Sequence, residues 1–244
     1  MKLDGATVVV TGGARRVGRH VARRMAERGA NIVVNYRTSA DEAAEAVGEF
    51  KTLGVDALAV QGDVSTYDGV AAVRDAAIHR FGSVEVLVNN ASIYYPTPID
   101  ELTEDDLDRN IAVNLKGPFL GCWLFGLHMR DHGGGKIVNV ADWAVDRPYK
   151  NYAPYFAAKG GVVALTKVMA KELAPTVLVN AIAPGPILLP EDFTPEMIRG
   201  VERATLVKRI GNPEDIAQTA LYLIEGTDFV TGAVITVDGG RQVV

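Results

Sequence analysis

The amino-acid sequence predicts a single α/β domain, a doubly wound parallel sheet with helices on both faces, three layers in all. Short β-branched runs alternate with longer helical patterns, as in folds whose parallel strands are joined by helical crossovers. The runs are continuously apolar rather than alternating, which is typical of strands covered on both faces. The 244 residues, 48% of them hydrophobic, suit one large core better than two.

The expected strands are these β-branched runs, and each of them is short. They span residues 7–10, 32–34, 86–88, 137–140, 177–179 and 234–237. Pro184-Gly185-Pro186 ends the strand that begins near Thr176, since proline has no N–H for a sheet ladder.

Helical patterns fill the intervals between these strands. The first follows Val17, Val21 and Met25 and ends at Gly29, a suitable left-handed terminator. Further helices are expected at 41–53, at 67–81, at 107–129 and from Pro154 to about Leu173. The apolar-rich segment 107–129 is expected to hold two consecutive helices, broken at or just before Gly117-Pro118.

The least regular segment is 187–205, which contains Pro190, Pro195 and mixed charges. Loops at the carboxyl ends of parallel strands bind ligands in such sheets, so we interpret this insertion as a substrate lid or a small helical flap. A merely solvated connection is the alternative.

Composition excludes several function classes. A net charge of −5 without any basic run argues against nucleic acid or an anionic membrane surface as a partner. No apolar stretch reaches the roughly 20 residues that span a bilayer, and no signal peptide is recognised. The lone Cys122 excludes an intrachain disulfide and fits a reducing compartment, so a cytoplasmic protein with a small-molecule substrate is expected.

A glycine-rich turn joins the first expected strand to the first helix. Gly12, Gly13 and Gly18 lie in this turn, where backbone amides and the helix dipole can hold a pyrophosphate. The position between a strand and a helix makes the signal specific for a dinucleotide cofactor.

The end of the second strand predicts NADPH rather than NADH. The stretch 35–39 lacks the carboxylate that would hold the ribose diol of NAD. Arg37 and Ser39 instead offer a cation and a hydroxyl for a 2′-phosphate, and Arg15 lies in the turn that would face it. The alternative is that these arginines are ordinary surface charges.

Tyr155 and Lys159 stand one helical turn apart and can point into one cleft. Their pairing indicates hydride chemistry in which a tyrosine acts as the acid. A phenol has an ordinary pKa near 10, and the nearby cation is expected to favour phenolate and bring the group into range. Asp142 precedes Tyr155 by thirteen residues and is either a site carboxylate or a solvated loop residue.

The chain resembles the short-chain dehydrogenase/reductase family over essentially its whole length. The matching motifs are Thr11-Gly12 through Gly18, Asp63-Val64, Asn89-Asn90-Ala91, Asn114, Tyr155 to Lys159, and Pro184-Gly185. The resemblance implies a Rossmann-type fold and a set of cofactor contacts: Gly12, Arg15, Arg16, Val17, Gly18, Tyr36, Arg37, Ser39, Asp63, Val64, Asn90, Ala91, Ser92, Tyr155, Lys159, Pro184, Gly185 and Ile187. It also implies that Lys159 holds the nicotinamide ribose and that Asn114 helps to place a water near Lys159.

Two departures from the common family pattern narrow the resemblance. Arg16 replaces the second glycine of the turn, and Asp142 replaces the catalytic serine. Both occur in the pteridine reductase branch, which the stretch 89–98 also resembles. The branch implies that Tyr94 covers a pterin ring against the nicotinamide, and that Ser92 and Arg16 lie beside the pterin and the cofactor phosphates.

The chemistry of Asp142 supports the same interpretation. A ketone reductase benefits from a hydroxyl that donates to the carbonyl oxygen, where negative charge develops, and a carboxylate would oppose that charge. A pterin presents N–H donors and needs protons on nitrogen, so a carboxylate can orient it and support proton delivery by Tyr155. We expect Arg16, Ser92, Tyr94, Asp142 and Tyr155 to contact substrate, and Asn114, Asp142, Tyr155 and Lys159 to act in catalysis.

The leading hypothesis is therefore an NADPH-dependent reductase of pterins or dihydrofolate. The first alternative is a carbonyl reductase of the 3-oxoacyl carrier-protein type, which shares the fold and the tyrosine–lysine pair. The second is a cofactor-binding sensor without turnover, against which Tyr155, Lys159 and Asn114 argue.

Two weaker signals concern metals and subunits. His128 and His132 are four residues apart, but no third ligand is evident and no metal site is expected. The apolar segment 115–127 exceeds what one helix face needs, and the resemblance makes it a subunit contact. The resemblance also implies that the last strand pairs subunits into a homotetramer.

Overall fold

The computed structural model describes residues 1–190 and 192–244. Seven strands occur in this part of the chain: β1 Thr7–Val10, β2 Asn31–Tyr36, β3 Ala57–Gln61, β4 Val86–Asn89, β5 Gly135–Val140, β6 Val177–Pro184 and β7 Val234–Val237. They form one parallel sheet in the order β3-β2-β1-β4-β5-β6-β7. Successive strands are added to one side of β1 up to β3 and to the other side from β4 onwards. Doubly wound folds bind ligands at this switch point between β1 and β4.

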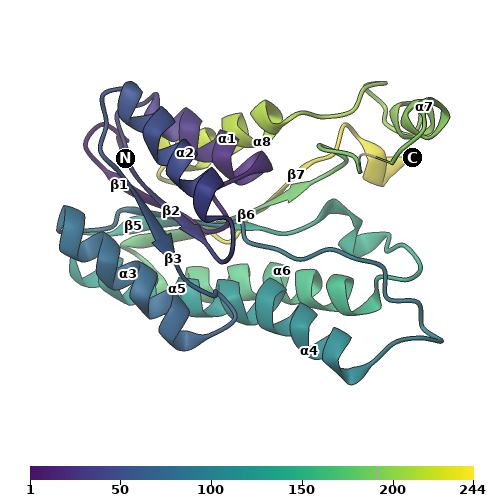
Figure 1. Cartoon of the computed structure of the whole chain (residues 1–244), viewed down its shortest axis with the longest axis horizontal. Coiled ribbons are helices and arrows are strands. Elements are labelled where there is room, and N and C mark those ends of the chain that lie inside the picture. The colour runs from purple at the N-terminus through teal and green to yellow at the C-terminus, as the bar shows by residue number, and fades with distance from the viewer. Residues whose placement is uncertain (191) are drawn as a thin grey trace.

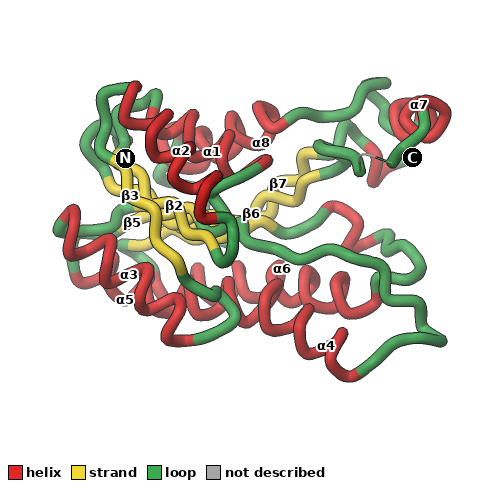
Figure 2. Tube along the Cα trace, viewed as in Figure 1, coloured by secondary structure: helices red, strands yellow, loops and turns green. Residues whose placement is uncertain are grey.

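Helices cover both faces of this sheet. The α-helices of the described residues are α1 Arg16–Ala26, α2 Ala40–Thr52, α3 Tyr67–Phe81, α4 Glu104–Ile111, α5 Gly117–Asp131, α6 Ala153–Leu173, α7 Pro195–Arg203 and α8 Pro213–Leu221. In Figures 1 and 2, α1, α2 and α8 lie on one side of the strands and α3, α4, α5 and α6 on the other. The expectation of a three-layer, doubly wound single domain is confirmed.

One strand and one α-helix, β3 and α8, were not expected from the sequence. The strand β3 has only Val60 as a β-branched residue, and it pairs with β2 alone at the edge of the sheet, so its pattern is weak. The helix α8 begins at a capping box in which Asn212 and Asp215 each accept the other's backbone N–H. This cap was a usable signal. The prediction of six strands was therefore wrong by one.

The segment 107–129 is continuous rather than broken. Between α4 and α5 the chain makes a π-helical turn, η1 Ala112–Lys116, so the expected break just before Gly117 is a bulge and not an interruption. Pro118 lies in the first turn of α5, where its missing N–H costs little. The bulge matters because it carries Asn114 towards the loop that follows β4.

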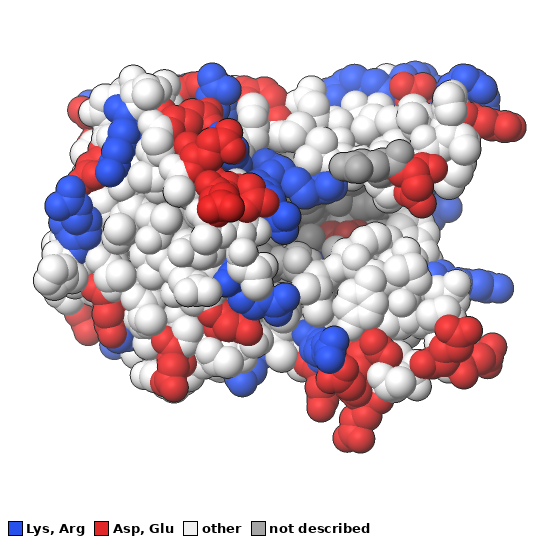
Figure 3. All heavy atoms as spheres, viewed as in Figure 1, with Lys and Arg blue, Asp and Glu red and all other residues white. Residues whose placement is uncertain are grey.

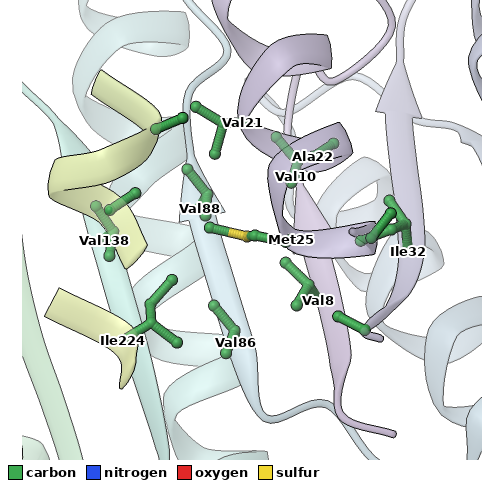
Figure 4. Packing of buried hydrophobic residues seen from close by; sticks show 14 of the residues in the cluster. Val8, Val10, Val21, Ala22, Met25, Ile32, Val86, Val88, Val138 and Ile224 are labelled. Atoms are coloured by element: carbon green, nitrogen blue, oxygen red, sulfur yellow. The ribbon is translucent and has the colours of Figure 1, made fainter. Parts of the chain in front are cut away.

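The core lies in two layers separated by the sheet. Val8 and Val10 point to the layer of α1 and α8, and Val9 points to the layer of α3 and α5, as the period of two in a strand requires. Figure 4 shows Met25 of α1 lying over Val8 and its neighbours Val86 and Val88. Each such fully buried side chain stabilises the fold by about 1.5–3 kcal/mol, which gives the site a rigid base.

The segment 187–205 contains one helix, α7, as the helical-flap interpretation expects. Residue 191 of this segment lies outside the described residues. No residue of α7 is fully buried, and just after this helix the Leu206 N–H donates to the Gly239 carbonyl at 2.8 Å. Arg16 Nη2 donates to the Leu188 carbonyl at 3.2 Å, so the start of the segment contacts the glycine-rich turn.

Candidate active site

The carboxyl ends of the central strands open into a cavity of about 800 Å³. It is lined by every predicted cofactor and substrate residue: Gly12, Arg15, Arg16, Val17, Gly18, Tyr36, Arg37, Ser39, Asp63, Val64, Asn90, Ala91, Ser92, Tyr94, Asp142, Tyr155, Lys159, Pro184, Gly185 and Ile187. In Figure 3 a hollow lies near the middle of the face shown, with basic side chains gathered beside it. Asn114 is the one predicted site residue that does not line the cavity; it lies behind the wall.

The turn between β1 and α1 requires its glycines. Gly12 has a φ of +61°, and a Cβ on Gly18 would lie 2.5 Å from Asn90 Nδ2 and 2.5 Å from the Gly12 carbonyl oxygen. Thr11 Oγ1 accepts the Asn90 and Ala91 N–H groups at 2.9 and 3.0 Å, which fixes the turn against the end of β4.

The residues around this turn fit a dinucleotide. The N-terminus of α1 has no side-chain cap and no acidic residue in its first turn, so no protein carboxylate takes the place of a phosphate there. Arg15, Arg16 and Arg37 line the same end of the cavity. Burial alone would raise the pKa of Asp63, but hydrogen bonds from Ser65 and the charge of Arg37 lower it overall. The carboxylate therefore stays charged.

Arg16 adopts a left-handed backbone conformation with a φ of +53°. A non-glycine residue in this region is strained by about 1–2 kcal/mol. We expect Arg16→Gly to raise the melting temperature, by about 2–4 °C per kcal/mol of strain relieved in a chain of this size. We also expect it to weaken NADPH binding, because the cation is lost.

The comparison variant is Arg16→Ala, which removes the charge and keeps the strain. It should bind NADPH as weakly as Arg16→Gly without the gain in stability. Differential scanning calorimetry and fluorescence titration with NADPH measure the two effects. A glycine variant that melts no higher than the alanine variant would show that the backbone here is unstrained.

Tyr155, Lys159 and Asp142 all line the cavity. Tyr155 and Lys159 lie in the first two turns of α6, and Asp142 follows β5. The Tyr155 hydroxyl donates to Asp142 Oδ2 at 2.8 Å, and the Ala144 N–H donates to Asp142 Oδ1 at 2.8 Å. Lys159 Nζ donates to the Val140 carbonyl at 2.7 Å. Asp142 thus lines the cavity in contact with the Tyr155 hydroxyl and is not a solvated loop carboxylate; its role as a site residue stays a prediction.

The pKa shifts of Tyr155, Lys159 and Asp142 differ from the expectation that Lys159 favours the phenolate form of Tyr155. Burial and then the charge of Asp142 raise the pKa of Tyr155 well above its ordinary value. Burial lowers the pKa of Lys159 to about 8, against the opposing effect of Asp142, and the ammonium is directed at Val140 rather than at the phenol oxygen. Burial also raises the pKa of Asp142. The expected lowering of the phenol pKa is therefore not found, since burial and the Asp142 carboxylate both raise this pKa and the ammonium contacts Val140.

Asn114 is fully buried in the π-helical turn and anchors a loop. Its Oδ1 accepts from Ser92 Oγ at 2.8 Å and from the Ile93 N–H at 3.0 Å, while its Nδ2 donates to the Ile93 carbonyl at 3.0 Å and to Asn110 Oδ1 at 3.1 Å. The side chain therefore fixes the loop that carries Tyr94. Its expected role in placing a water near Lys159 stays a prediction.

Aromatic side chains form one wall of the cavity. The rings of Tyr94 and Tyr152 are stacked, with centroids 4.5 Å apart and planes within 8°, and Tyr94 meets Tyr155 edge-on at 4.8 Å. Trp143 and Tyr149 continue this wall, their centroids 6.0 Å apart. We call Tyr94, Trp143, Tyr149 and Tyr152 the aromatic wall. It offers flat apolar surface of the kind that binds planar rings.

Of the aromatic wall, only Tyr94 was expected from the sequence, and the other three members were not. All three lie between Asp142 and Tyr155, and the concentration of aromatic residues in this short interval was a usable signal. Arg241, from the 3-10 helix η4 Arg241–Val243, also lines the cavity and was not predicted.

The described residues give no sign of a metal centre or a membrane span. They contain no group of three or more His, Cys, Asp or Glu side chains able to hold a metal ion. His128 Nε2 instead accepts the Val84 N–H at 3.3 Å. None of their helices combines the length and apolar character needed to cross a bilayer.

The fold and the site together define an oxidoreductase that uses a nicotinamide nucleotide. The profile of the family described as "short chain dehydrogenase" matches residues 6–193. The chain belongs to this short-chain dehydrogenase/reductase family, whose members use NAD(P) cofactors.

Three similar proteins illustrate the relationship. A 3beta-hydroxysteroid dehydrogenase 1 of Eggerthella lenta is 40% identical over 98% of this chain and 94% of its own length. A 3-oxoacyl-acyl-carrier-protein reductase of Staphylococcus epidermidis is 36% identical over 96% of this chain and 98% of its own. The crystal structure of a putative short-chain alcohol dehydrogenase from Sinorhizobium meliloti has a TM-score of 0.94 at 31% identity and covers 99% of this chain and 98% of that one.

These relatives support the family but not the expected branch. Their names describe a hydroxysteroid dehydrogenase, an oxoacyl reductase and an alcohol dehydrogenase, and none of the three is named a pteridine reductase. They agree better with the carbonyl alternative than with the leading hypothesis.

Proposed function

We propose that the protein is an NADPH-dependent reductase of a planar nitrogen heterocycle, a pterin or a dihydrofolate. The observation that carries the proposal is the hydrogen bond from the Tyr155 hydroxyl to Asp142 Oδ2 at 2.8 Å, inside the cavity. A carboxylate at this position accepts N–H groups, which a pterin ring presents and a simple ketone does not. The aromatic wall supports the same class of substrate, since it offers stacking surface.

Different residues of the chain bind the cofactor, orient the substrate and supply the proton. The glycine turn and Arg15, Arg16 and Arg37 hold NADPH, which supplies the hydride when bound. Asp142 orients the heterocycle, and the Tyr155 hydroxyl beside it donates a proton to the ring nitrogen next to the reduced carbon. Lys159 holds the nicotinamide ribose, and Asn114 keeps the loop of Tyr94 in place.

The preference for NADPH rests on the end of β2. Arg37 lines the cavity and no described carboxylate lies within 4 Å of it in an ion pair, so its charge remains available to a 2′-phosphate. We expect Arg37→Asp to shift the ratio of kcat/KM for NADPH over NADH towards NADH by about 10–100-fold, the loss of a charge-assisted contact plus a new repulsion.

Steady-state kinetics with both cofactors and one substrate measure this ratio. Arg23→Asp is a matched control, because Arg23 lies on the exposed side of α1 and is not among the cavity-lining residues. An unchanged ratio in Arg37→Asp would show that another group selects the cofactor.

A carbonyl reductase is the second candidate function. It is favoured by the relatives named for an oxoacyl reductase and a hydroxysteroid dehydrogenase, which align over nearly the whole chain. In this case Tyr155 would protonate the carbonyl oxygen, and the carboxylate of Asp142 would have to be protonated or turned away, since its charge opposes the developing oxyanion. The raised pKa of Asp142, caused first by burial, makes the protonated form more accessible.

One assay panel separates the candidates. Oxidation of NADPH is followed at saturating cofactor with dihydrobiopterin, dihydrofolate, an acetoacetyl thioester and a 3-oxosteroid. Turnover of the dihydropterins supports the proposal, whereas turnover confined to the thioester or the steroid selects the carbonyl candidate. NADPH binding without any turnover would favour the sensor.

We further propose a lid, an oligomeric state and a cellular location. The segment 187–205 acts as a lid, supported by its contact with Arg16. The chain assembles as a homotetramer, supported by the exposed aromatic side chains of Tyr67, Phe119 and Trp123 on α3 and α5, and light scattering measures its mass. A cytoplasmic location agrees with a lone cysteine, Cys122, that is buried.

A further inference from the structure

One arginine of the cavity lies away from the glycine turn. Arg15, Arg16 and Arg37 belong to the turn and to the end of β2, where they suit the cofactor. Arg241 comes from η4 at the C-terminus and lies at the aromatic wall, with its Cζ 5.2 Å from the ring centroid of Trp143. Its charge also acts on Tyr149, another member of the wall. Arg241 therefore faces the substrate part of the cavity.

The backbone that carries Arg241 is held firmly. The buried carboxylate of Asp238 accepts the Gly240 N–H at 2.8 Å through Oδ1 and the Gln242 N–H at 2.7 Å through Oδ2. Arg147 Nη1 donates to the Arg241 carbonyl at 3.2 Å. With both ends of the residue fixed and its side chain against Trp143, the guanidinium loses little freedom when it binds a ligand.

The charge of Arg241 is not neutralised by the residues that the structure describes. None of their carboxylates forms an ion pair with it, and the donors to the Asp142 oxygens are the Tyr155 hydroxyl and the Ala144 N–H, not Arg241. A guanidinium that stacks on a ring keeps its edge N–H groups free for a planar anion. A fixed cation with free donors in the wall of the cavity is suited to binding an anion.

We propose that Arg241 binds an anionic group of the substrate, a carboxylate or a phosphate, and so selects substrates that carry one beyond the reduced ring. This inference rests on the proposed function, because it assumes that the group to be reduced lies beside Tyr155. Among dihydropterins it predicts a preference for dihydrofolate, whose glutamate carries carboxylates, over dihydrobiopterin, whose side chain is neutral.

The test compares kcat/KM for an anionic and a neutral substrate in the wild type and in Arg241→Gln. We expect Arg241→Gln to lower kcat/KM for dihydrofolate on the order of 10- to 100-fold, the loss of a charged hydrogen-bonded pair, and to reduce the dihydrofolate/dihydrobiopterin ratio by a similar factor. Arg241→Lys should recover part of this ratio, since it keeps the charge without the planar fork. Arg109→Gln is the matched control, because Arg109 pairs with Asp105 on α4 and is not among the cavity-lining residues.

The same variants test the anion subsite if the protein does not reduce dihydropterins. In that case the proposed function fails, and the pair becomes acetoacetyl-coenzyme A, which carries phosphates, and the neutral acetoacetyl thioester of N-acetylcysteamine. A selective loss on the phosphate-bearing thioester supports the anion subsite. The anion subsite is overturned if Arg241→Gln lowers kcat/KM equally for both members of the pair that is turned over, or for neither. It is also overturned if none of the four compounds is turned over.

Discussion

We expect Tyr155→Phe to lower turnover by about 10²–10⁴-fold, the usual contribution of a positioned general acid. The reason is local: the Tyr155 hydroxyl is the protonated group in contact with Asp142, and burial with the Asp142 charge keeps its pKa well above the ordinary value. Phenylalanine preserves the edge-on ring contacts with Tyr94 and Phe156, so the cavity keeps its shape. NADPH affinity should stay close to that of the wild type.

The free energy of unfolding of Tyr155→Phe should fall as well. Removing the hydroxyl leaves Asp142 Oδ2 without its donor, and a buried acceptor without a partner costs about 1–3 kcal/mol. Chemical denaturation, NADPH titration and single-turnover kinetics measure stability, binding and chemistry separately. Tyr222→Phe is a suitable control, because Tyr222 is half exposed and is not among the cavity-lining residues. Turnover that survives in Tyr155→Phe would mean that water or another residue supplies the proton.

The sequence could predict most of the fold because the strands are buried on both faces. Val8, Val9 and Val10 show this: each faces packed side chains, so the apolar run is continuous and easy to recognise. The edge strand β3 is the counterexample, since alanine and leucine there are not distinguished from a loop or a helix by composition. Edge strands are constrained by one neighbour only, and their sequences carry less information.

Some site residues can be predicted from local sequence spacing, and others are brought together only by the fold. The glycine turn and the pair Tyr155–Lys159 are local, and each lies within one strand–turn–helix unit or one helical turn. The contact of Asp142 with the Tyr155 hydroxyl is not local, because it crosses the loop between β5 and α6, and its charge adds to the rise that burial already causes in the Tyr155 pKa. Arg241 joins the cavity from the opposite end of the sequence, and no spacing rule predicts such a contact.

We expect Asp142 to determine the class of substrate, and we expect Asp142→Ser to change the substrate preference. Serine keeps the cap of the 3-10 helix η2 Trp143–Asp146, since it accepts the Ala144 N–H as Asp142 does, so the backbone should hold. It replaces an acceptor for pterin N–H groups by a donor suited to a carbonyl oxygen. Turnover of dihydropterins should fall on the order of 10- to 100-fold, the value of a charged hydrogen bond, while turnover of the acetoacetyl thioester rises.

The pH profile gives an independent reading of the same change. Because the charge of Asp142 is the second cause of the raised Tyr155 pKa, its removal must bring that pKa down, although burial still holds it up. The loss of reductive activity at high pH should therefore begin at a lower pH in Asp142→Ser than in the wild type.

The variant Asp142→Asn separates charge from shape. It lowers the Tyr155 pKa in the same way and keeps an acceptor for the tyrosine hydroxyl, but it offers no carboxylate to a pterin. If Asp142 acts on the substrate, the asparagine and serine variants both lose dihydropterin turnover while their NADPH affinity stays unchanged. If pterin turnover and NADPH affinity fall together in both, Asp142 is a structural cap, and the tyrosine–lysine pair alone cannot distinguish a nitrogen heterocycle from a ketone.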